Sequence, residues 1–157
     1  MDREQLAVYA EKYSKAVYRA AYSYVHNHAD SEDITEETFL RLYKCKKDFG
    51  SDENVKAWLL RVAINIAKDH LKSSWIHKRE ELDESMKCGD EKEYSLDEAM
   101  AKLKPDYRIA VYLHYYMGYS VRETAKLLGI TESNVKIRLK RGRDALREIL
   151  TDEQKGG

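Results

Sequence analysis

The residues best suited to a chemical task lie near the C-terminal end of the chain, where polar and basic side chains recur at helical spacing. A step of about 100° per residue places five side chains on one helix face: Ser133, Asn134, Ile137, Lys140 and Arg141. Lys136 and Arg138 fall on the flanks of this face. Hydroxyl, amide and cationic groups are the ones that contact phosphates and base edges in DNA grooves. The spacing therefore predicts a DNA-binding helix.

A second cluster of residues offers different chemistry. His26, His28 and Asp30 lie close together in the sequence, and imidazole and carboxylate groups are zinc ligands. A polar turn with two histidines and no assured third ligand is more commonly a solvated loop. A metal hydrolase is therefore the least favoured functional hypothesis, behind the two DNA-binding functions described below. Cys45 and Cys88 lack the paired spacing of a zinc site and are predicted to be free thiols. We expect no cofactor and no catalytic site.

Two short helices around a tight turn would position the DNA-binding face. Ser120 and Glu123 form a capping box that begins the first helix, which ends near Leu128. Gly129 can adopt the positive φ that ends this helix, and Thr131 caps the second one. The narrow inner face of the second helix consists of Val135, Leu139, Gly142 and Leu146. This pattern predicts a helix-turn-helix.

The composition predicts an all-α protein made of two small helical domains. The chain has 157 residues, one proline and 36% charged residues, and its apolar residues recur at helical spacing without strand-like alternation. No apolar run approaches the roughly eighteen residues of a membrane span, and the N-terminus has no apolar signal core. We therefore expect a cytoplasmic protein.

The charges cancel over the whole chain but are segregated along it. Nine acidic and only two basic residues lie between Glu80 and Glu98, whereas six basic residues and one acidic residue lie between Lys136 and Arg147. Residues 76–94 are accordingly predicted to be a flexible acidic linker. It would join a domain at residues 1–75 to a second domain at residues 95–151.

Helical periodicity places three helices in the first domain, at about residues 2–25, 31–45 and 53–73. Ser31 is the predicted cap of the second helix, whose inward stripe is Ile34, Thr38, Leu42 and Cys45. On the third helix the predicted inward residues are Val55, Leu59, Val62 and Ile66. Residues 48–52 read as a turn that contains Phe49, and the polar Asn65 in an apolar run suggests a partner group.

The second domain is predicted to begin with two helices before the helix-turn-helix. A capping box at Ser95 begins a helix that ends near Leu103. Pro105 suits the first turn of the next helix, which Gly118 would end. The inward residues of that helix are predicted to be Ile109, Leu113 and Tyr116.

Three of these stretches, in this order, resemble the conserved regions of extracytoplasmic-function sigma factors of the sigma-70 family. Residues 31–43 (SEDITEETFLRLY) resemble the region 2 helix that docks on RNA polymerase. Residues 56–71 (KAWLLRVAINIAKDHL) resemble the helix that melts and reads the minus-ten element. Residues 119–147 resemble region 4, which reads the minus-thirty-five element. The resemblance implies a promoter-recognition subunit of bacterial RNA polymerase.

The resemblance also implies a role for individual residues. Asp33, Glu37, Phe39 and Arg41 would contact core RNA polymerase. Phe49 and Asn65 would help to form the pocket for a flipped minus-ten base, and Trp58 would anchor the domain. The other predicted minus-ten contacts are Lys68, Asp69, Lys72, Lys78 and Arg79. The predicted minus-thirty-five contacts are Ser133, Asn134, Lys136, Ile137, Arg138, Lys140 and Arg141.

The implied partners are core RNA polymerase, promoter DNA and an anti-sigma factor, often membrane-bound, with no small-molecule substrate. The acidic linker would be either a connector that mimics nucleic acid or a solvated tether. Thr124 and Gly142 depart from the family pattern, and a glycine within a helix costs about 0.5–1 kcal/mol relative to alanine. The alternative function, a stand-alone dimeric helix-turn-helix regulator, accounts for the C-terminal half but leaves the acidic helix and Asn65 unexplained.

Overall fold

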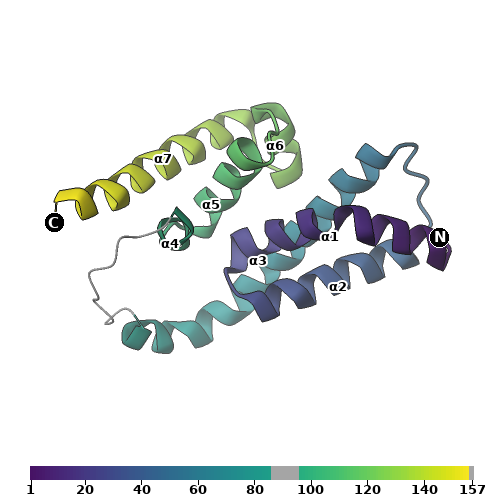
Figure 1. The fold of residues 1–157 in the computed structure, drawn as a ribbon, viewed down its shortest axis with the longest axis horizontal. Coiled ribbons are helices and arrows are strands. Elements are labelled where there is room, and N and C mark those ends of the chain that lie inside the picture. The colour runs from purple at the N-terminus through teal and green to yellow at the C-terminus, as the bar shows by residue number, and fades with distance from the viewer. Residues whose placement is uncertain (86–95, 156–157) are drawn as a thin grey trace.

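The structure, a computed structural model, describes the backbone of residues 1–85 and 96–155 and the side chains of residues 1–73 and 96–151. Within these ranges the chain is all-α, as predicted, with no strand. Three helices form the N-terminal domain and the remaining helices form the C-terminal domain (Figure 1). None of the described helices is long and apolar enough to cross a membrane.

The N-terminal domain is a bundle of three helices. These are α1 (Arg3–Val25), α2 (His28–Lys44) and α3 (Asp52–Ser85). The predicted inward residues of α2 are correct, because Ile34, Thr38 and Leu42 are buried and Cys45 is half-buried. Its predicted cap was wrong: Asn27 accepts the hydrogen bond that caps α2, and Ser31 is buried within the helix.

The third helix differs from its prediction in length and in the face that it buries. Its backbone continues to Ser85, which is well beyond the predicted end at residue 73. The fully buried face contains Leu59, Leu60, Ala63, Ile64 and Ala67, whereas the predicted Val62 and Ile66 are only half-buried. Because α3 contacts both α1 and α2, its buried stripe is wider than the single narrow stripe predicted from spacing.

The C-terminal domain carries the predicted helix-turn-helix. Its elements are α4 (Leu96–Ala101), α5 (Pro105–Val111), a π-helical segment η1 (Tyr112–Tyr116), α6 (Val121–Leu128) and α7 (Glu132–Lys155). Pro105 begins α5, as predicted. Ile109 and Leu113 are buried, but Tyr116 is 63% exposed and its predicted inward position was wrong. The wider turn of the π-helix shifts the helical repeat, which rotates Tyr116 outward.

Gly142 permits two helices of this domain to approach closely. A Cβ atom at this position would lie 2.8 Å from Cγ2 of Val111 and 3.6 Å from the Cβ of Tyr107. The glycine is therefore a packing requirement of the contact between α5 and α7, not simply a weak point in α7.

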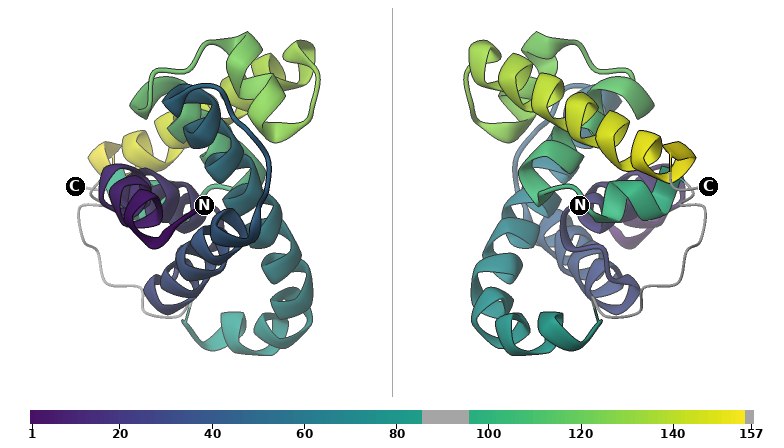
Figure 2. Two further views of the ribbon diagram at one scale, coloured as in Figure 1. Left: turned by 90° about the vertical axis from the view of Figure 1, so that its right-hand side faces the viewer. Right: turned by 90° about the vertical axis from the view of Figure 1, so that its left-hand side faces the viewer.

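The two domains pack against each other, and their buried apolar residues form one continuous core. Helix α5 contacts α1, and α6 contacts α3. In Figures 1 and 2, α5 lies between α7 and the N-terminal bundle. The predicted linker, residues 76–94, lies outside the described side chains, as does Cys88.

Candidate nucleic-acid interface

Three hydrogen bonds and one glycine set the geometry of the helix-turn-helix. The Ser120 hydroxyl accepts from the backbone N–H of Glu123 at 3.0 Å, and the Glu123 carboxylate accepts from the N–H of Ser120 at 3.1 Å. The bond from the backbone N–H of Ser120 to the carboxylate is the largest cause that holds the pKa of Glu123 below its usual value, and the Ser120 side chain contributes in the same direction. Gly129 ends α6 with φ +68°. Thr131 then caps α7 by accepting from the N–H of Asn134 at 3.1 Å.

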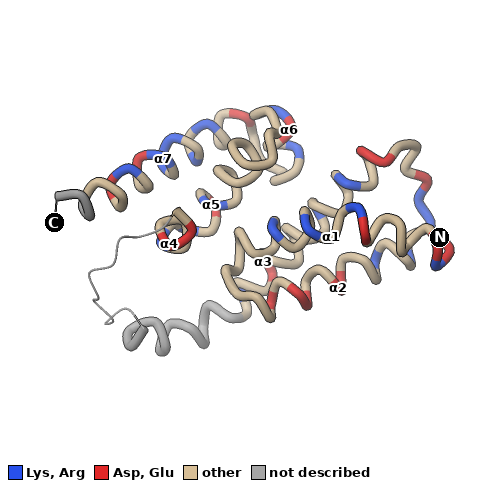
Figure 3. The backbone as a smooth tube through the Cα atoms, viewed as in Figure 1, with Lys and Arg blue, Asp and Glu red and all other residues tan. Residues whose placement is uncertain are grey.

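The exposed face at the start of α7 corresponds closely to the predicted DNA-binding face. Val135 and Leu139 are buried beneath it. Of the predicted contacts, the side chains that remain exposed are Ser133, Asn134, Lys136, Ile137, Lys140 and Arg141. Ile137 is 47% exposed, so the face offers an apolar contact among its polar ones. Figure 3 shows basic residues along most of α7, which gives this helix a positive surface.

Arg138 differs from its neighbours on α7. Its side chain is only 18% exposed, and its Nη1 atom lies 3.7 Å from the Asp106 carboxylate at the start of α5. In this arrangement Arg138 therefore faces the interior of the C-terminal domain and is not part of the exposed basic face.

A cavity of about 550 Å³ brings together residues from the loop before α3 and from α3 itself. It is lined by Lys47, Phe49, Asn54, Ala57, Trp58, Arg61, Val62 and Asn65. The Phe49 and Trp58 rings meet edge to face, with their centroids 5.5 Å apart. The loop is held in place because the Asn54 side chain donates to the carbonyl of Phe49 at 2.7 Å.

The lining of this cavity suits an unstacked nucleotide base. The aromatic rings offer surfaces on which a base can stack, and an amide such as that of Asn65 can donate to and accept from a base edge. Lys47 and Arg61 add positive charge at the same site, where a phosphate would need it. The structure thus places the predicted Phe49 and Asn65 around one cavity, together with Trp58, which also packs against the core.

The other predicted minus-ten residues are not all gathered at this cavity. Asp69 and Lys72 are exposed further along α3. Lys68 points toward the C-terminal domain, where its ammonium donates to the carbonyl of Leu128 at 3.3 Å. Burial lowers the pKa of Lys68, and the nearby Arg138 contributes in the same direction. The side chain of Arg79, like that of Lys78, lies outside the described residues.

Helix α2 presents an exposed acidic face, in contrast to the basic face of α7. Asp33, Glu37 and Arg41 are exposed at intervals of four residues, and Arg41 forms an ion pair with Glu37 at 3.1 Å. Leu40 belongs to the same face by its helical position and is 51% exposed. Phe39 is half-buried against the core, on another side of the helix. In Figure 3 the acidic residues of α2 lie in its N-terminal part and basic residues follow toward its C-terminal end, whereas basic residues predominate along α7.

Four residues with a part in these sites were missed in the sequence: Leu40, Lys47, Asn54 and Arg61. Leu40 could have been found because it follows Glu37 by three residues on the acidic face. Lys47 and Arg61 gave no such signal, because only the fold brings the loop next to α3.

The suggested metal site is not formed. His26 contacts Tyr22, His28 contacts Tyr18, and Asp30 pairs with His70. Across the described residues, no cluster of three potential metal ligands exists.

Comparison with known proteins matches both domains to one family. The family model for Sigma-70 region 2 matches residues 9–76, and the model for Sigma-70, region 4 matches residues 94–146. This chain belongs to the extracytoplasmic-function sigma factors of the sigma-70 family. The α2 face and the cavity thus lie within its region 2, and the helix-turn-helix lies within its region 4.

Two curated sigma factors illustrate the relationship. The chain is 30% identical over 162 residues to the ECF RNA polymerase sigma factor BldN of Streptomyces coelicolor, a match that covers 91% of this chain and 59% of BldN. It is 27% identical over 171 residues to the ECF RNA polymerase sigma factor SigW of Bacillus subtilis, covering 96% and 91% of the two chains. The sigma factor thus spans nearly all of SigW but less than two thirds of BldN.

Two solved structures have the same fold as this sigma factor. One is the sigma factor RpoE in complex with the anti-sigma factor NepR from Bartonella quintana, with a TM-score of 0.69 and 22% identity over 90% of this chain and 94% of that chain. The other is CnrH in complex with the cytosolic domain of CnrY, with a TM-score of 0.69 and 21% identity. This match covers 96% of this chain and 90% of that chain.

Proposed function

We propose that this sigma factor directs core RNA polymerase to specific promoters through two separate DNA-reading surfaces. Residues 1–75 bind the polymerase and open the minus-ten element, and residues 95–151 read the minus-thirty-five element. The observation that carries the proposal is the coexistence of an aromatic-lined cavity in region 2, large enough to admit a base, with an exposed polar and basic helix in region 4. The first suits a single-stranded base and the second a duplex groove.

Polymerase binding is assigned to the acidic face of α2. Asp33, Glu37 and Arg41 supply charges on the outside of the helix, and the exposed Leu40 supplies apolar area among them. Interfaces commonly combine an apolar centre with a polar rim. Phe39 would support this surface from the core side of α2.

Promoter opening is assigned to the cavity beside α3. A flipped base would stack on Phe49, and its polar edge would bond to the Asn65 amide. Lys72 and Arg79 would contact phosphates nearby, with Asp69 and Lys68 on the same helix. Base insertion traps the melted state, because the energy lost by unstacking is partly recovered within the cavity.

Reading of the upstream element is assigned to the start of α7. Ser133, Asn134 and Ile137 have the chemistry for base contacts, since an amide can bind an adenine edge and an apolar side chain can contact a thymine methyl group. The exposed basic residues Lys136, Lys140 and Arg141 would position the helix on phosphates or read guanine. Arg138 would join them only if its side chain left its position beside Asp106.

The protein would act without catalysis of its own and without a cofactor or small-molecule substrate. Its activity would be exerted in the cytoplasm, where polymerase and chromosome meet. We further propose that an anti-sigma factor, which could be membrane-bound, holds it inactive. RpoE, which shares its fold, is described in complex with such a factor.

Run-off transcription with purified core RNA polymerase tests the proposal. We expect promoter-specific transcripts only when both the sigma factor and core polymerase are present. Genomic fragments bound by the reconstituted holoenzyme would supply the promoter templates. Specific duplex binding by the free chain that matches the affinity of the holoenzyme, especially at palindromic sites, would contradict the proposal and favour a stand-alone regulator.

A further inference from the structure

The loop between α2 and α3 carries Phe49 and is tied down by hydrogen bonds from residues on either side of it. The Asp48 carboxylate accepts from the backbone N–H of Gly50 at 3.1 Å, and Gly50 has a φ of +78°. This bond closes a tight turn around Phe49. From the other side, the side-chain amide of Asn54 donates to the Phe49 carbonyl at 2.7 Å. The Phe49 backbone is therefore restrained by neighbouring side chains and not by regular secondary structure.

Asn54 itself stands on a well-anchored part of the chain. It lies in the first turn of α3, which begins at Asp52. Two contacts join this turn to α1: Lys12 forms an ion pair with the Asp52 carboxylate at 2.7 Å, and the Tyr13 hydroxyl donates to the Asp52 carbonyl at 3.3 Å. Because the start of α3 is held by the helical bundle, the bond from Asn54 to Phe49 restrains the loop and not the helix.

Two successive turns of α3 hold Phe49 at two points. Trp58 follows Asn54 by four residues and so lies on the same helix face. The Trp58 ring meets the Phe49 ring edge to face at 5.5 Å, while Asn54 binds the Phe49 carbonyl. Asn65, further along α3, lines the same cavity as these three residues. The ring on which a base would stack is therefore held in place relative to the amide that would bind its edge.

We propose that Asn54 is a positioning residue for promoter opening: it holds the Phe49 loop against α3 before DNA arrives, so that the cavity is already formed when a base is flipped. A loop that became ordered only on binding would lose conformational entropy at that moment. Preorganisation removes this cost and tightens binding without a new contact to the ligand. The use of the cavity in opening rests on the proposed function, whereas the restraint of the loop rests on the contacts alone.

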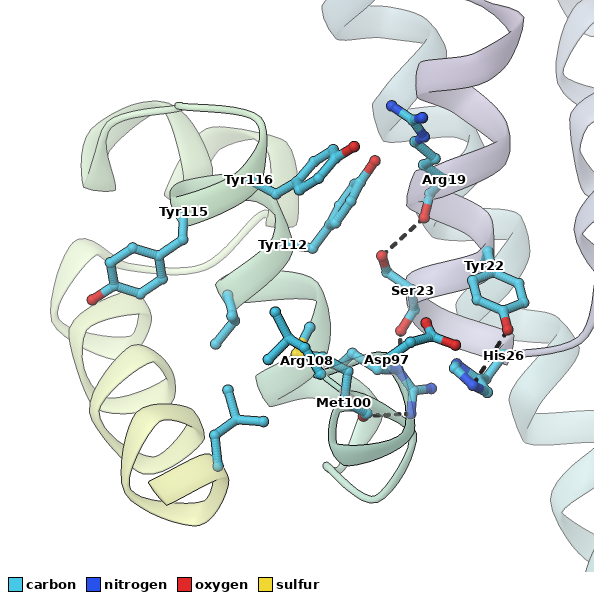
Figure 4. A pocket seen from close by; sticks show the side chains of 13 residues that line it. Arg19, Tyr22, Ser23, His26, Asp97, Met100, Arg108, Tyr112, Tyr115 and Tyr116 are labelled. Atoms are coloured by element: carbon cyan, nitrogen blue, oxygen red, sulfur yellow. Dashed lines mark hydrogen bonds between the residues drawn. The ribbon is translucent and has the colours of Figure 1, made fainter. Parts of the chain in front are cut away.

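Two variants separate this role from a contribution to the stability of α3. Asn54→Ala removes the amide at an exposed position. Asn54→Asp keeps the size of the side chain but leaves no donor for the Phe49 carbonyl at neutral pH, and a carboxylate in the first turn of a helix is favourable for the helix dipole. Tyr115→Phe is the matched control, because it removes one exposed hydrogen bond from the C-terminal domain. The Tyr115 hydroxyl, on η1 (Figure 4), accepts from Arg143 at 2.9 Å.

Nuclear magnetic resonance relaxation of the free sigma factor tests the restraint without DNA or polymerase. In the wild type, the backbone N–H groups of Phe49 and Gly50 should have order parameters near about 0.85, the value of a rigid backbone. In both Asn54 variants these order parameters should fall below about 0.6, as in flexible segments, whereas Tyr115→Phe should leave them unchanged. A wild-type loop that is already flexible, or unchanged order parameters in either Asn54 variant, would overturn the proposal.

Binding of the holoenzyme to promoter DNA with an unpaired minus-ten segment tests the consequence for base capture. Abasic sites introduced one at a time into each strand of this segment first locate the position at which wild-type binding depends on a base. On the intact template, Asn54→Ala should bind about threefold to tenfold more weakly, the effect of one hydrogen bond. With an abasic site at the located position, the variant and the wild type should bind equally, because no base remains to be captured.

The outcomes of the binding experiment distinguish positioning from a purely structural role. An equal loss of affinity on the intact and the abasic template, or no loss on either, would overturn the proposal, and Tyr115→Phe should match the wild type on both. If no abasic site weakens wild-type binding, the proposed function fails and the role of Asn54 in opening fails with it. If wild-type binding depends on a base but the Phe49 loop does not loosen in the Asn54 variants, only the positioning role fails.

Discussion

Replacement of Gly142 by alanine tests the packing of region 4 most directly, because two opposing effects can be compared. In an isolated helix, Gly→Ala stabilises by about 1 kcal/mol, since glycine loses more conformational freedom on folding. Here the new Cβ would lie 2.8 Å from Cγ2 of Val111, which is closer than atoms in contact can approach. Relief of such overpacking typically costs about 1–3 kcal/mol.

The net expectation is that Gly142→Ala lowers the free energy of unfolding by about 1 kcal/mol, with the overpacking term exceeding the propensity term. For a chain of this length, 1 kcal/mol corresponds to a decrease in melting temperature of about 2–4 °C. Thermal and urea unfolding, followed by the helical circular dichroism signal, would measure the change.

A double-mutant cycle with Val111→Ala separates the two terms. Val111→Ala removes Cγ2, the nearest atom to the new methyl group. In that background Gly142→Ala should stabilise the protein by up to about 1 kcal/mol. The clash with Cγ2 of Val111 is then absent, so the higher helix propensity of alanine remains and its methyl group fills the space that Val111→Ala leaves. If Gly142→Ala stabilises the otherwise wild-type protein, or if its effect is the same in both backgrounds, the close approach of α5 and α7 does not explain the glycine.

Four further perturbations have defined outcomes. Thr124 is fully buried and its hydroxyl has no hydrogen-bond partner among the described residues, so Thr124→Val should raise the free energy of unfolding by about 1 kcal/mol; a loss of stability in urea titrations would contradict this. Asn65→Ala should impair open-complex formation, measured by permanganate reactivity of unpaired thymines, while polymerase binding is unchanged; normal opening would remove Asn65 from the cavity's function. Arg141→Ala should weaken promoter binding by about 1–3 kcal/mol if Arg141 reads a base. If Arg141 binds a phosphate, the variant should instead lower the slope of log affinity against log salt concentration by about 1. Unaltered affinity at every salt concentration would exclude both roles. Burial lowers the pKa of His26, so the unfolded chain binds more protons than the folded one and the free energy of unfolding falls as pH drops below about 6.5. His26→Asn suits the positive φ at this helix end and should make this fall smaller. Parallel profiles of unfolding free energy against pH for the two proteins would contradict this role of His26.

Much of region 4 could be predicted because its signals are local. The capping box of Ser120 and Glu123, the positive φ of Gly129 and the Thr131 cap each depend on residues within one helical turn. The exposed face of α7 followed from the same spacing that buries Val135 and Leu139. The cap of α2 is a local feature that was misassigned, because Asn27 and Ser31 are both good cap residues and stand one turn apart.

The sites that combine distant segments were only partly predictable. Phe49 and Asn65 were paired through the resemblance to known sigma factors, whereas Lys47 and Arg61 joined them only once the fold placed the loop beside α3. The α3 face was misjudged because two neighbouring helices, not one, cover it. Tyr116 was misplaced because a π-helical turn changes the repeat on which the prediction relied.

The sequence by itself determined the number and order of the main helices, the caps of α6 and α7 and the polar face of α7, since these depend on propensity and on contacts between near neighbours. Only the tertiary structure decided why Gly142 is a glycine, where Lys68 and Arg138 point, and that Arg108 is buried. These properties depend on atoms from residues far apart in the chain, as when the Arg108 guanidinium binds the carbonyls of Ser23 and Tyr24. Helical spacing carries no information about which helix ends meet, so it could not reveal that the N-terminal and C-terminal domains pack against each other.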